Sequence, residues 1–266
     1  YTDFTGYAGA TDTVAVTGVT SSLDMNSGKT YTNIAKVSMN ASGASSAITL
    51  TGVSSVSNSI ISGSGNDTII AGTQIDTLAG GSGNDTFQIN SNYLTSADTI
   101  SDTSGSDTLE ITNAAATITD AQLTNVTNIE ILKLAAGSMV TLGTEANNSG
   151  NGFTTVNVSA GGANTINNST INNLSVIGGA GTDTLNISGG VAINASNLSG
   201  VENLNITSGT SAMTGTLSAA TTATIASGAT LTTTVPSTTL SGKTIVINGS
   251  LSATEVNGTD VSHVTL

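Results

Sequence analysis

The chain has 266 residues, with 17 acidic side chains against four lysines and no arginine, which gives a formal net charge of −13. Binding to nucleic acid or to an anionic membrane surface requires clustered cations, so this balance argues against both partners. There is no cysteine, which excludes disulfides, zinc–thiolate sites and cysteine nucleophiles. An acid-rich chain instead attracts hard cations such as calcium, which prefer oxygen ligands.

The predicted secondary structure is almost entirely β. Short runs in which apolar residues alternate with Thr, Ser and Asn predict strands at residues 12–17, 107–112, 183–188, 203–207 and 244–248. The best helix candidate is the short segment 119–126. No apolar run is long enough for a membrane helix, so we expect no membrane insertion. The first residue is not Met, and we expect residues 1–266 to be a fragment of a larger protein.

A nine-residue repeat occupies residues 62–88. The copies 62–70, 71–79 and 80–88 place Asp67, Asp76 and Asp85 nine residues apart, each followed by Thr and an apolar residue. An isolated copy at 178–186 has Asp183 in the same position, and a decayed copy at 53–61 has Asn58 there. Repetition at a fixed period predicts a repeat architecture.

A longer and looser unit also recurs. The separation of Asp12 from Ile34 equals that of Asp107 from Ile129, and the separation of Asp183 from Leu204 is shorter by a single position. Matched spacing of this kind indicates stacked β coils, each burying its apolar face against the next. We therefore predict an all-β fold, a parallel β-solenoid or β-roll with irregular loops, with solenoid repeats over residues 107–266.

The nonapeptides have the composition of a metal-binding loop. Glycines at the second and fourth positions (Gly63, Gly65, Gly81 and Gly83) allow a positive φ, so that loop carbonyls turn inward. The aspartate adds a carboxylate, and the apolar residue that follows enters the core. The alternative is a plain Gly-Asn-Asp turn, which three tandem copies disfavour more than one copy would.

Residues 62–88 resemble the RTX (repeats-in-toxin) nonapeptides of secreted Gram-negative bacterial proteins. The resemblance implies a six-residue turn followed by a three-residue strand, with calcium between alternate loops of the repeat. Carried onto this chain, it implies that Asp67 and Asp85 share one Ca²⁺ with the carbonyls of Gly63, Gly65, Gly81 and Gly83. Asp76 would have a doubtful site, because its partner loop carries only Asn58, or nothing recognisable after residue 89, and Gln74 replaces a glycine. Asp183 is a candidate ligand or a plain turn residue.

The longer units, with their DTLNI, GVENLNI and TNIEIL segments, are similar to RTX-containing surface-layer proteins. This resemblance implies an extracellular protein at the cell surface, exported by type I secretion and folded by extracellular calcium. It implies a structural component that assembles with copies of itself into a lattice or filament, with outer-membrane polysaccharide as a candidate anchor. The alternatives are a segment of an RTX adhesin or extracellular filament and, third, a calcium-folded accessory region of a secreted enzyme.

Catalysis by this chain is not expected. Its one histidine, His263, lies three residues from the last residue, and Asp98, Asp102 and Asp107, which could be imagined as a glycosidase pair, flank a degenerate turn. Glu130 and Glu202 occupy equivalent places in two repeats, which predicts a shared structural role such as bonding a neighbouring loop. The threonine-rich segment 213–241 could form an ice-binding face, but threonine is also a common exposed strand residue.

Overall fold

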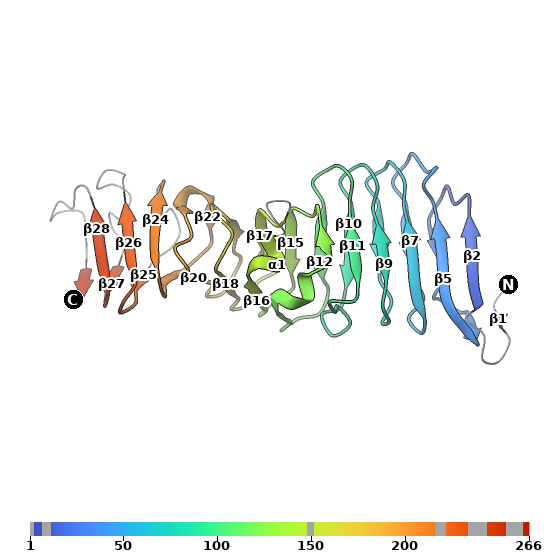
Figure 1. The fold of residues 1–266 in the computed structure, drawn as a ribbon, viewed down its shortest axis with the longest axis horizontal. Helices are drawn as coiled ribbons and strands as arrows, with labels where there is room; N and C mark the ends of the chain where they lie inside the picture. The colour runs from blue at the N-terminus through green and yellow to red at the C-terminus, as the bar shows by residue number, and fades with distance from the viewer. Residues whose placement is uncertain are drawn as a thin grey trace. The chain divides into compact units, whose positions relative to one another are not determined.

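The computed structural model describes residues 3–6, 12–147, 152–215, 222–233, 244–253 and 263–265. The chain divides into two compact units: unit 1 (Tyr1–Asn113, Ala121–Leu132 and Gly150–Gly152) and unit 2 (Ala114–Asp120, Lys133–Ser149 and Phe153–Leu266). Within the described residues the strands pair in parallel, and each unit is a stack of β coils (Figure 1). The predicted all-β parallel solenoid is confirmed.

Unit 1 has two main faces of stacked strands. The first face consists of β3 (Leu23–Asp24), β6 (Thr49–Thr51), β8 (Thr68–Ile70), β10 (Thr86–Ile89) and β12 (Thr108–Ile111). The second consists of β2 (Asp12–Thr17), β5 (Ile34–Asn40), β7 (Ser57–Ile61), β9 (Thr77–Ala79), β11 (Thr99–Ser101) and β14 (Val126–Thr127). A separate pair is formed by β1 (Asp3–Thr5) and β4 (Thr30–Thr32), and β15 (Ile131–Leu134) contains the boundary with unit 2 along the chain.

Unit 2 has three sets of stacked strands. The longest set consists of β13 (Thr117–Ile118), β16 (Met139–Leu142), β18 (Thr165–Asn168), β20 (Thr184–Ile187), β23 (Asn203–Ile206), β25 (Thr222–Ile225), β27 (Thr244–Ile247) and β29 (His263–Thr265). The second consists of β21 (Ile193–Asn194), β24 (Thr210–Thr214), β26 (Thr230–Thr233) and β28 (Ser250–Ala253), and the third of β17 (Thr155–Asn157), β19 (Ser175–Ile177) and β22 (Leu198–Ser199).

The core is a set of apolar columns that run along the stack. Successive side chains of a strand point to opposite faces, so in-register parallel pairing places like residues above one another. In unit 1 one column consists of Leu50, Ile69, Phe87 and Leu109, all buried. In unit 2 the corresponding column consists of Val140, Ile166, Leu185 and Leu204. The residue before each member is polar in most strands and points outward, which explains the alternation in the sequence.

The two repeat lengths of the sequence are two lengths of coil. Thr68 pairs with Thr86, which makes two nonapeptides one short coil, and Thr86 pairs with Thr108, which makes the next stretch one long coil. Asp12 lies opposite Ile34, so the first of the longer units also spans one coil, whereas Leu185 pairs with Leu204, so the unit that begins at Asp183 lies in a shorter coil. Most of the irregularity of the solenoid therefore lies in the loops, and among the strand pairs β2 and β5 have a register shift between Asp12 and Thr13.

Helix is confined to short turns. The segment expected to be helical contains the 3₁₀ turn η1 (Asp120–Leu123), whereas the single α-turn of the described ranges, α1 (Thr144–Asn147), was not expected. The Asp120 carboxylate accepts hydrogen bonds from the amides of Gly143, Glu145 and Ala146, so α1 is capped by a residue one coil away. Because the capping residue is distant along the chain, no local sequence motif predicts α1. A further 3₁₀ turn, η3, spans Ala195–Asn197. None of the helices in the described ranges could cross a membrane.

The threonine-rich segment 213–241 is described over residues 213–215 and 222–233. There, Thr230 and Thr232 of β26 lie beside Thr210 and Ala212 of β24. In the described part of this face, the two outward positions are therefore not both threonine in every coil. The interpretation of these threonines as ordinary exposed strand residues fits better than an ice-binding face.

Replacement of the largest core side chain should destabilise unit 1. We expect Phe87→Ala to lower the free energy of unfolding by about 3–5 kcal/mol, because it leaves a cavity in the apolar column. Thr77→Ala, at an exposed outward position of β9, is the matched control and should change it by less than about 0.5 kcal/mol. Urea denaturation followed by circular dichroism measures both values; equal effects would contradict the assignment of the core.

Candidate metal centre

Three equivalent loops stack along one edge of unit 1. Residues 62–67 connect β7 to β8, residues 80–85 connect β9 to β10, and residues 102–107 connect β11 to β12. Backbone bonds join the first two loops, from the Ser82 amide to the Gly63 carbonyl (2.9 Å), and the last two, from the Gly83 amide to the Ser104 carbonyl (3.0 Å). The predicted six-residue turn with a following strand, and the facing of loops 62–67 and 80–85, are confirmed.

The last residue of each loop is an aspartate that bonds to the coil before it. The Asp67 amide donates to Asp85 Oδ1 (2.7 Å), and the Asp85 amide donates to Asp107 Oδ1 (2.7 Å). The Asp107 amide donates in turn to Glu130 Oε2 (2.9 Å). A carboxylate from each coil thus satisfies a buried backbone donor of its neighbour, and this ladder runs along the stack.

The same ladder occurs on the opposite edge of unit 1. Asp76 Oδ1 accepts from the amide of Asn58 (2.8 Å), and the Asp76 amide donates to Asp98 Oδ1 (2.7 Å). The expected facing of Asp76 with Asn58 is therefore confirmed, whereas the expectation of nothing recognisable after residue 89 was wrong. The missed signal is Asp98-Thr99-Ile100, which has the Asp-Thr-apolar pattern one long coil after Asp76. This motif was missed because the change from short to long coils moves it out of the nine-residue period.

In unit 2 the isolated repeat forms a shorter ladder. Asp183 Oδ1 accepts from the backbone and side-chain amides of Asn164 (3.1 and 2.8 Å), and Oδ2 accepts from Gly179 N (2.9 Å). The Asp183 amide donates to Glu202 Oε2 (2.8 Å). Because Glu130 does the same for Asp107, the predicted role of the two equivalent glutamates in bonding a neighbouring loop is confirmed.

The glycines of the repeats serve two different purposes. Gly81 and Gly83 have φ values of 104° and 120°, as the sequence predicts, whereas Gly63 and Gly65 do not have a positive φ. At Gly63 and Gly65 the reason for glycine is space, because an added Cβ would overlap the backbone of Ala44 and Ser46 in the preceding coil. A Cβ at Gly83 would likewise overlap the Gly65 carbonyl oxygen. Glycine therefore lets successive loops stack backbone against backbone.

Backbone amides already bond the carboxylates of Asp67 and Asp76. Asp67 accepts from Ile48 N at Oδ1 (2.9 Å) and from Gly63 N at Oδ2 (3.1 Å), and Asp76 Oδ2 accepts from Gly72 N (2.7 Å). Each carboxylate oxygen has two lone pairs, so one amide bond leaves capacity for a metal. The proposed sharing of one ion by Asp67 and Asp85 remains a prediction.

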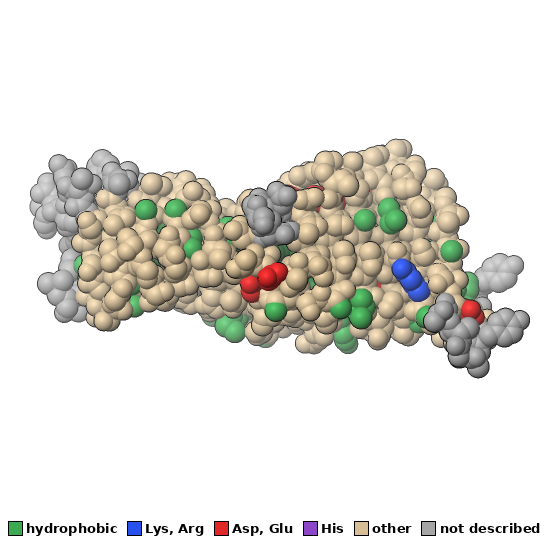
Figure 2. All heavy atoms as spheres, in the orientation of Figure 1, with side chains coloured by type: hydrophobic (Ala, Val, Ile, Leu, Met, Phe, Trp, Pro, Cys, Tyr) green, Lys and Arg blue, Asp and Glu red, His purple; other side chains and the backbone are tan. Residues whose placement is uncertain are grey.

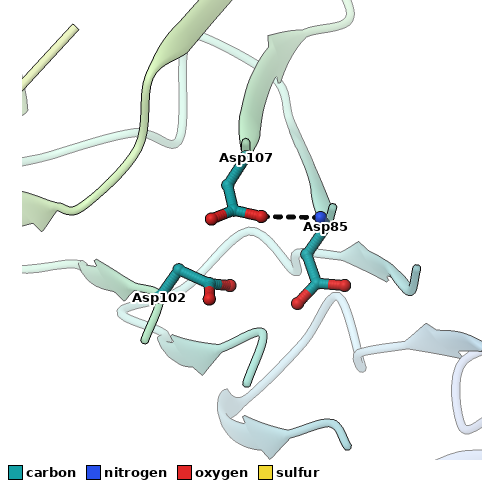
Figure 3. Close-up of side chains that lie close together, drawn as sticks. All are labelled: Asp85, Asp102 and Asp107. Atoms are coloured by element: carbon teal, nitrogen blue, oxygen red, sulfur yellow. Dashed lines mark hydrogen bonds between the residues drawn. The ribbon is translucent and has the colours of Figure 1, made fainter. Parts of the chain in front are cut away.

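Asp85 belongs to a cluster of three carboxylates with Asp102 and Asp107 (Figure 3). One carboxylate oxygen from each residue lies within 4.8 Å of the others, and the exposed fractions are 1%, 4% and 1% for Asp85, Asp102 and Asp107. Asp85 Oδ2 and Asp102 Oδ2 are buried and accept no hydrogen bond. Two ionised carboxylates are acceptors only, so these oxygens require a proton or a cation between them.

Burial is the main influence on the acidity of this cluster. It raises the pKa of Asp85 to about 7 and that of Asp107 to about 6, and it also raises the pKa of Asp102. The negative charges of the neighbouring carboxylates add to the effect on Asp85 and Asp107. The site is therefore poorly suited to hold three negative charges without a cation.

The residues present fit a bound calcium ion. Calcium takes carboxylate and carbonyl oxygen atoms as ligands, and the cluster supplies carboxylates in a region closed to bulk water. The orphaned Oδ2 atoms of Asp85 and Asp102 are the particular observation that favours a cation here. Neither Asp102 nor Asp107 was predicted as a ligand. Asp107 repeats the Asp-Thr-apolar signal of Asp85, whereas Asp102 stands at the first position of the loop, where the three tandem copies have Ser62, Ala71 and Gly80, and gave no signal.

Comparison with known proteins identifies one family. The family model for the RTX calcium-binding nonapeptide repeat (4 copies) matches residues 57–88. No curated protein and no solved structure matches the chain. The matched residues contain Asn58, Asp67, Asp76 and Asp85, and repeats of this family bind calcium.

Close stacking of the loops predicts a specific glycine requirement. We expect Gly83→Ala to destabilise unit 1 by about 1–3 kcal/mol from the positive φ alone, with a further loss from overlap with Gly65. Gly43→Ala is the matched control, because a Cβ there meets nothing within 4 Å, and it should have a neutral or slightly stabilising effect. Thermal unfolding compares the two variants, and a tolerated Gly83→Ala would refute the stacking argument.

The raised pKa values predict an unusual pH dependence for the metal-free protein. Because the folded state holds its protons to a higher pH than the unfolded state, folding takes up protons between about pH 4 and pH 7. The contribution of this cluster to stability without metal should therefore be greatest below about pH 4 and be lost as pH rises through the folded pKa of Asp85, about 7. Melting temperatures in chelator between pH 5 and pH 8 check this, and Asp85→Asn should flatten the slope. A melting temperature that rises with pH would contradict the assignment.

Proposed function

Residues 57–88 are RTX calcium-binding nonapeptide repeats, and we propose that the chain is a structural, self-assembling part of a bacterial surface layer. The coarser function follows from the repeats themselves: this is a calcium-binding β-roll region of a secreted protein. In the proposal, extracellular calcium completes the fold and orders the contacts between subunits. RTX proteins are exported by type I systems and bind calcium outside the cell, which agrees with this order of events.

The observation that carries the proposal is the location of the negative charge. Within the described residues, seven aspartates are buried at junctions between coils, namely Asp67, Asp76, Asp85, Asp98, Asp102, Asp107 and Asp183. Buried like charges oppose folding until they are neutralised. Six of the seven lie in unit 1, around the matched repeats. The cation requirement therefore belongs to the stacking of coils and not to a surface site.

Calcium concentration can then decide whether the chain folds. Extracellular calcium modules bind with dissociation constants of about 10⁻⁴–10⁻³ M. At a free concentration ten times the dissociation constant, each ion stabilises the folded state by about 1.4 kcal/mol, and at cytosolic concentrations it contributes almost nothing. The chain would remain loose before export and fold outside the cell.

The surface of the coils supports a role in assembly. With so many aspartates buried, the face in Figure 2 consists mainly of uncharged polar side chains and backbone, with acidic and basic side chains at few places. Outward rows such as Thr68, Thr86 and Thr108 repeat along the stack. A repeated surface of low charge can contact copies of itself without strong repulsion. This is the property that a lattice subunit requires.

A calcium titration tests the proposal directly. We expect the strand signal in circular dichroism and ordered assemblies in negative-stain microscopy to appear together with calcium and to disappear with chelator. The double variant Asp67→Asn/Asp85→Asn should raise the calcium concentration needed for both changes by about tenfold or more, because ligand charge sets affinity. Asp24→Asn, an exposed aspartate outside the ladders, is the control.

Other outcomes separate the alternatives. Calcium-induced strand signal without assembly would favour an adhesin segment or an accessory region of a secreted enzyme over a lattice subunit. A chain that is fully folded in chelator at pH 8, and unchanged by the double variant, would remove the role of calcium.

A further inference from the structure

We propose that Asp85, Asp102 and Asp107 form a calcium site that extends beyond the matched repeats and binds more tightly than a site between loops 62–67 and 80–85. The inference rests on the proposed calcium-dependent folding and names a ligand, Asp102, that the nonapeptide pattern does not supply. It also places an ion at the junction between a short coil and a long coil. The short coil runs from Thr68 to Thr86, and the long coil runs from Thr86 to Thr108.

The residues that lengthen the second coil lie outside the two loops that form this junction. Loops 80–85 and 102–107 each contain six residues, from the end of β9 or β11 to the start of β10 or β12. The additional residues of the longer coil lie instead between β10, which ends at Ile89, and β11, which begins at Thr99. The two loops that flank the carboxylates can therefore stack as the loops of the regular repeats do, and Ser82 forms a parallel bridge with Ser104.

Asp102 occupies the first position of its loop, which is Gly80 in the preceding loop and Ser62 in the one before. Its Oδ1 accepts from the amides of Thr103 and Ser104, and this bonding directs Oδ2 toward the preceding loop. A Cβ added at Gly80 would overlap both Asp102 Oδ2 and Asp85 Oδ2. Asp85 Oδ2 and Asp102 Oδ2, which accept no hydrogen bond, therefore both lie next to the Cα of Gly80. The absence of a side chain at Gly80 leaves space for them.

The ladder holds the other carboxylates in a similar way. Asp85 Oδ1 accepts from the Asp67 amide. Asp107 Oδ1 accepts from the Asp85 amide, which is the dashed line in Figure 3. One oxygen of Asp85 and one of Asp102 are therefore fixed to backbone, while the second oxygen of each is buried without a donor. This differs from Asp67, whose two oxygens both accept amide bonds. The site is preorganised, and a cation would meet oxygens that have no competing partner.

The ligand set selects calcium by its chemistry. Three carboxylates without nitrogen or sulfur favour a hard cation over zinc or copper. Magnesium requires near-ideal octahedral geometry and usually keeps several waters, which a buried junction between coils provides poorly. Calcium affinity rises with the charge of the ligand set, so three carboxylates should bind more tightly than the two of loops 62–67 and 80–85.

The test is calorimetric calcium titration of the whole chain at pH 8 after removal of metal. We expect one tight binding event that Asp102→Asn weakens about tenfold or more, with the remaining events unchanged. Asp102→Gly, which restores the residue found at position 80, should remove the tight event and keep the strand signal at saturating calcium. Asp24→Asn should leave all events as in the unaltered chain.

The outcomes separate this inference from the proposed function. If the unaltered chain binds no calcium, both fail. If it binds calcium and folds with it, but Asp102→Asn and Asp102→Gly bind as tightly as the unaltered chain, only the role of Asp102 is refuted. A crystal structure of the unaltered chain with calcium gives an answer independent of variant folding. We expect a calcium peak bounded by the carboxylates of Asp85, Asp102 and Asp107, and a structure with calcium elsewhere but none there would overturn the inference.

Discussion

The fold depends on a hydrogen bond between a carboxylate of one coil and a backbone amide of the coil before it. In unit 1 this bond links Asp67, Asp85, Asp107 and Glu130 in one ladder and Asn58, Asp76 and Asp98 in another. It satisfies amides at the corners of the solenoid, where the strands end and the ladder bonds of the sheets stop. A buried donor left without a partner would cost about 1–3 kcal/mol at each corner.

This solution has an electrostatic consequence. An asparagine can accept the same bond, as Asn164 does from the Ser138 amide in unit 2, without introducing charge. The use of aspartate in successive coils of unit 1 therefore adds negative charge that amide bonds alone do not neutralise. The aspartates that close the corners are therefore also the residues at which a bound cation would offset this charge.

The solenoid tolerates irregular loops because the strand register does not depend on them. Thr86 pairs with Thr68 and with Thr108 although the coils differ in length, and the apolar column through Phe87 continues without interruption. The same tolerance explains how the helical turn α1 and the loop between β10 and β11 can be accommodated. The loops that carry Asp67, Asp85 and Asp107 each keep six residues, whereas the loop between β10 and β11 is longer and its last residue, Asp98, still accepts a hydrogen bond from the Asp76 amide.

The sequence by itself determined the elements that recur locally. Strand alternation, the nonapeptides at 62–88 and the spacing of about one coil between Asp12 and Ile34 all follow from one-dimensional periodicity, so the parallel solenoid was predictable. The resemblance to RTX nonapeptides added the facing of Asp67 with Asp85. The tertiary structure alone decided which aspartates meet after the period changes. It paired Asp76 with Asp98, used Asp120 to cap α1, and brought Asp102 to Asp85. The physical reason is that an insertion leaves the strands in register in space while it shifts the numbering, so that partners in adjacent coils no longer share a constant separation along the chain.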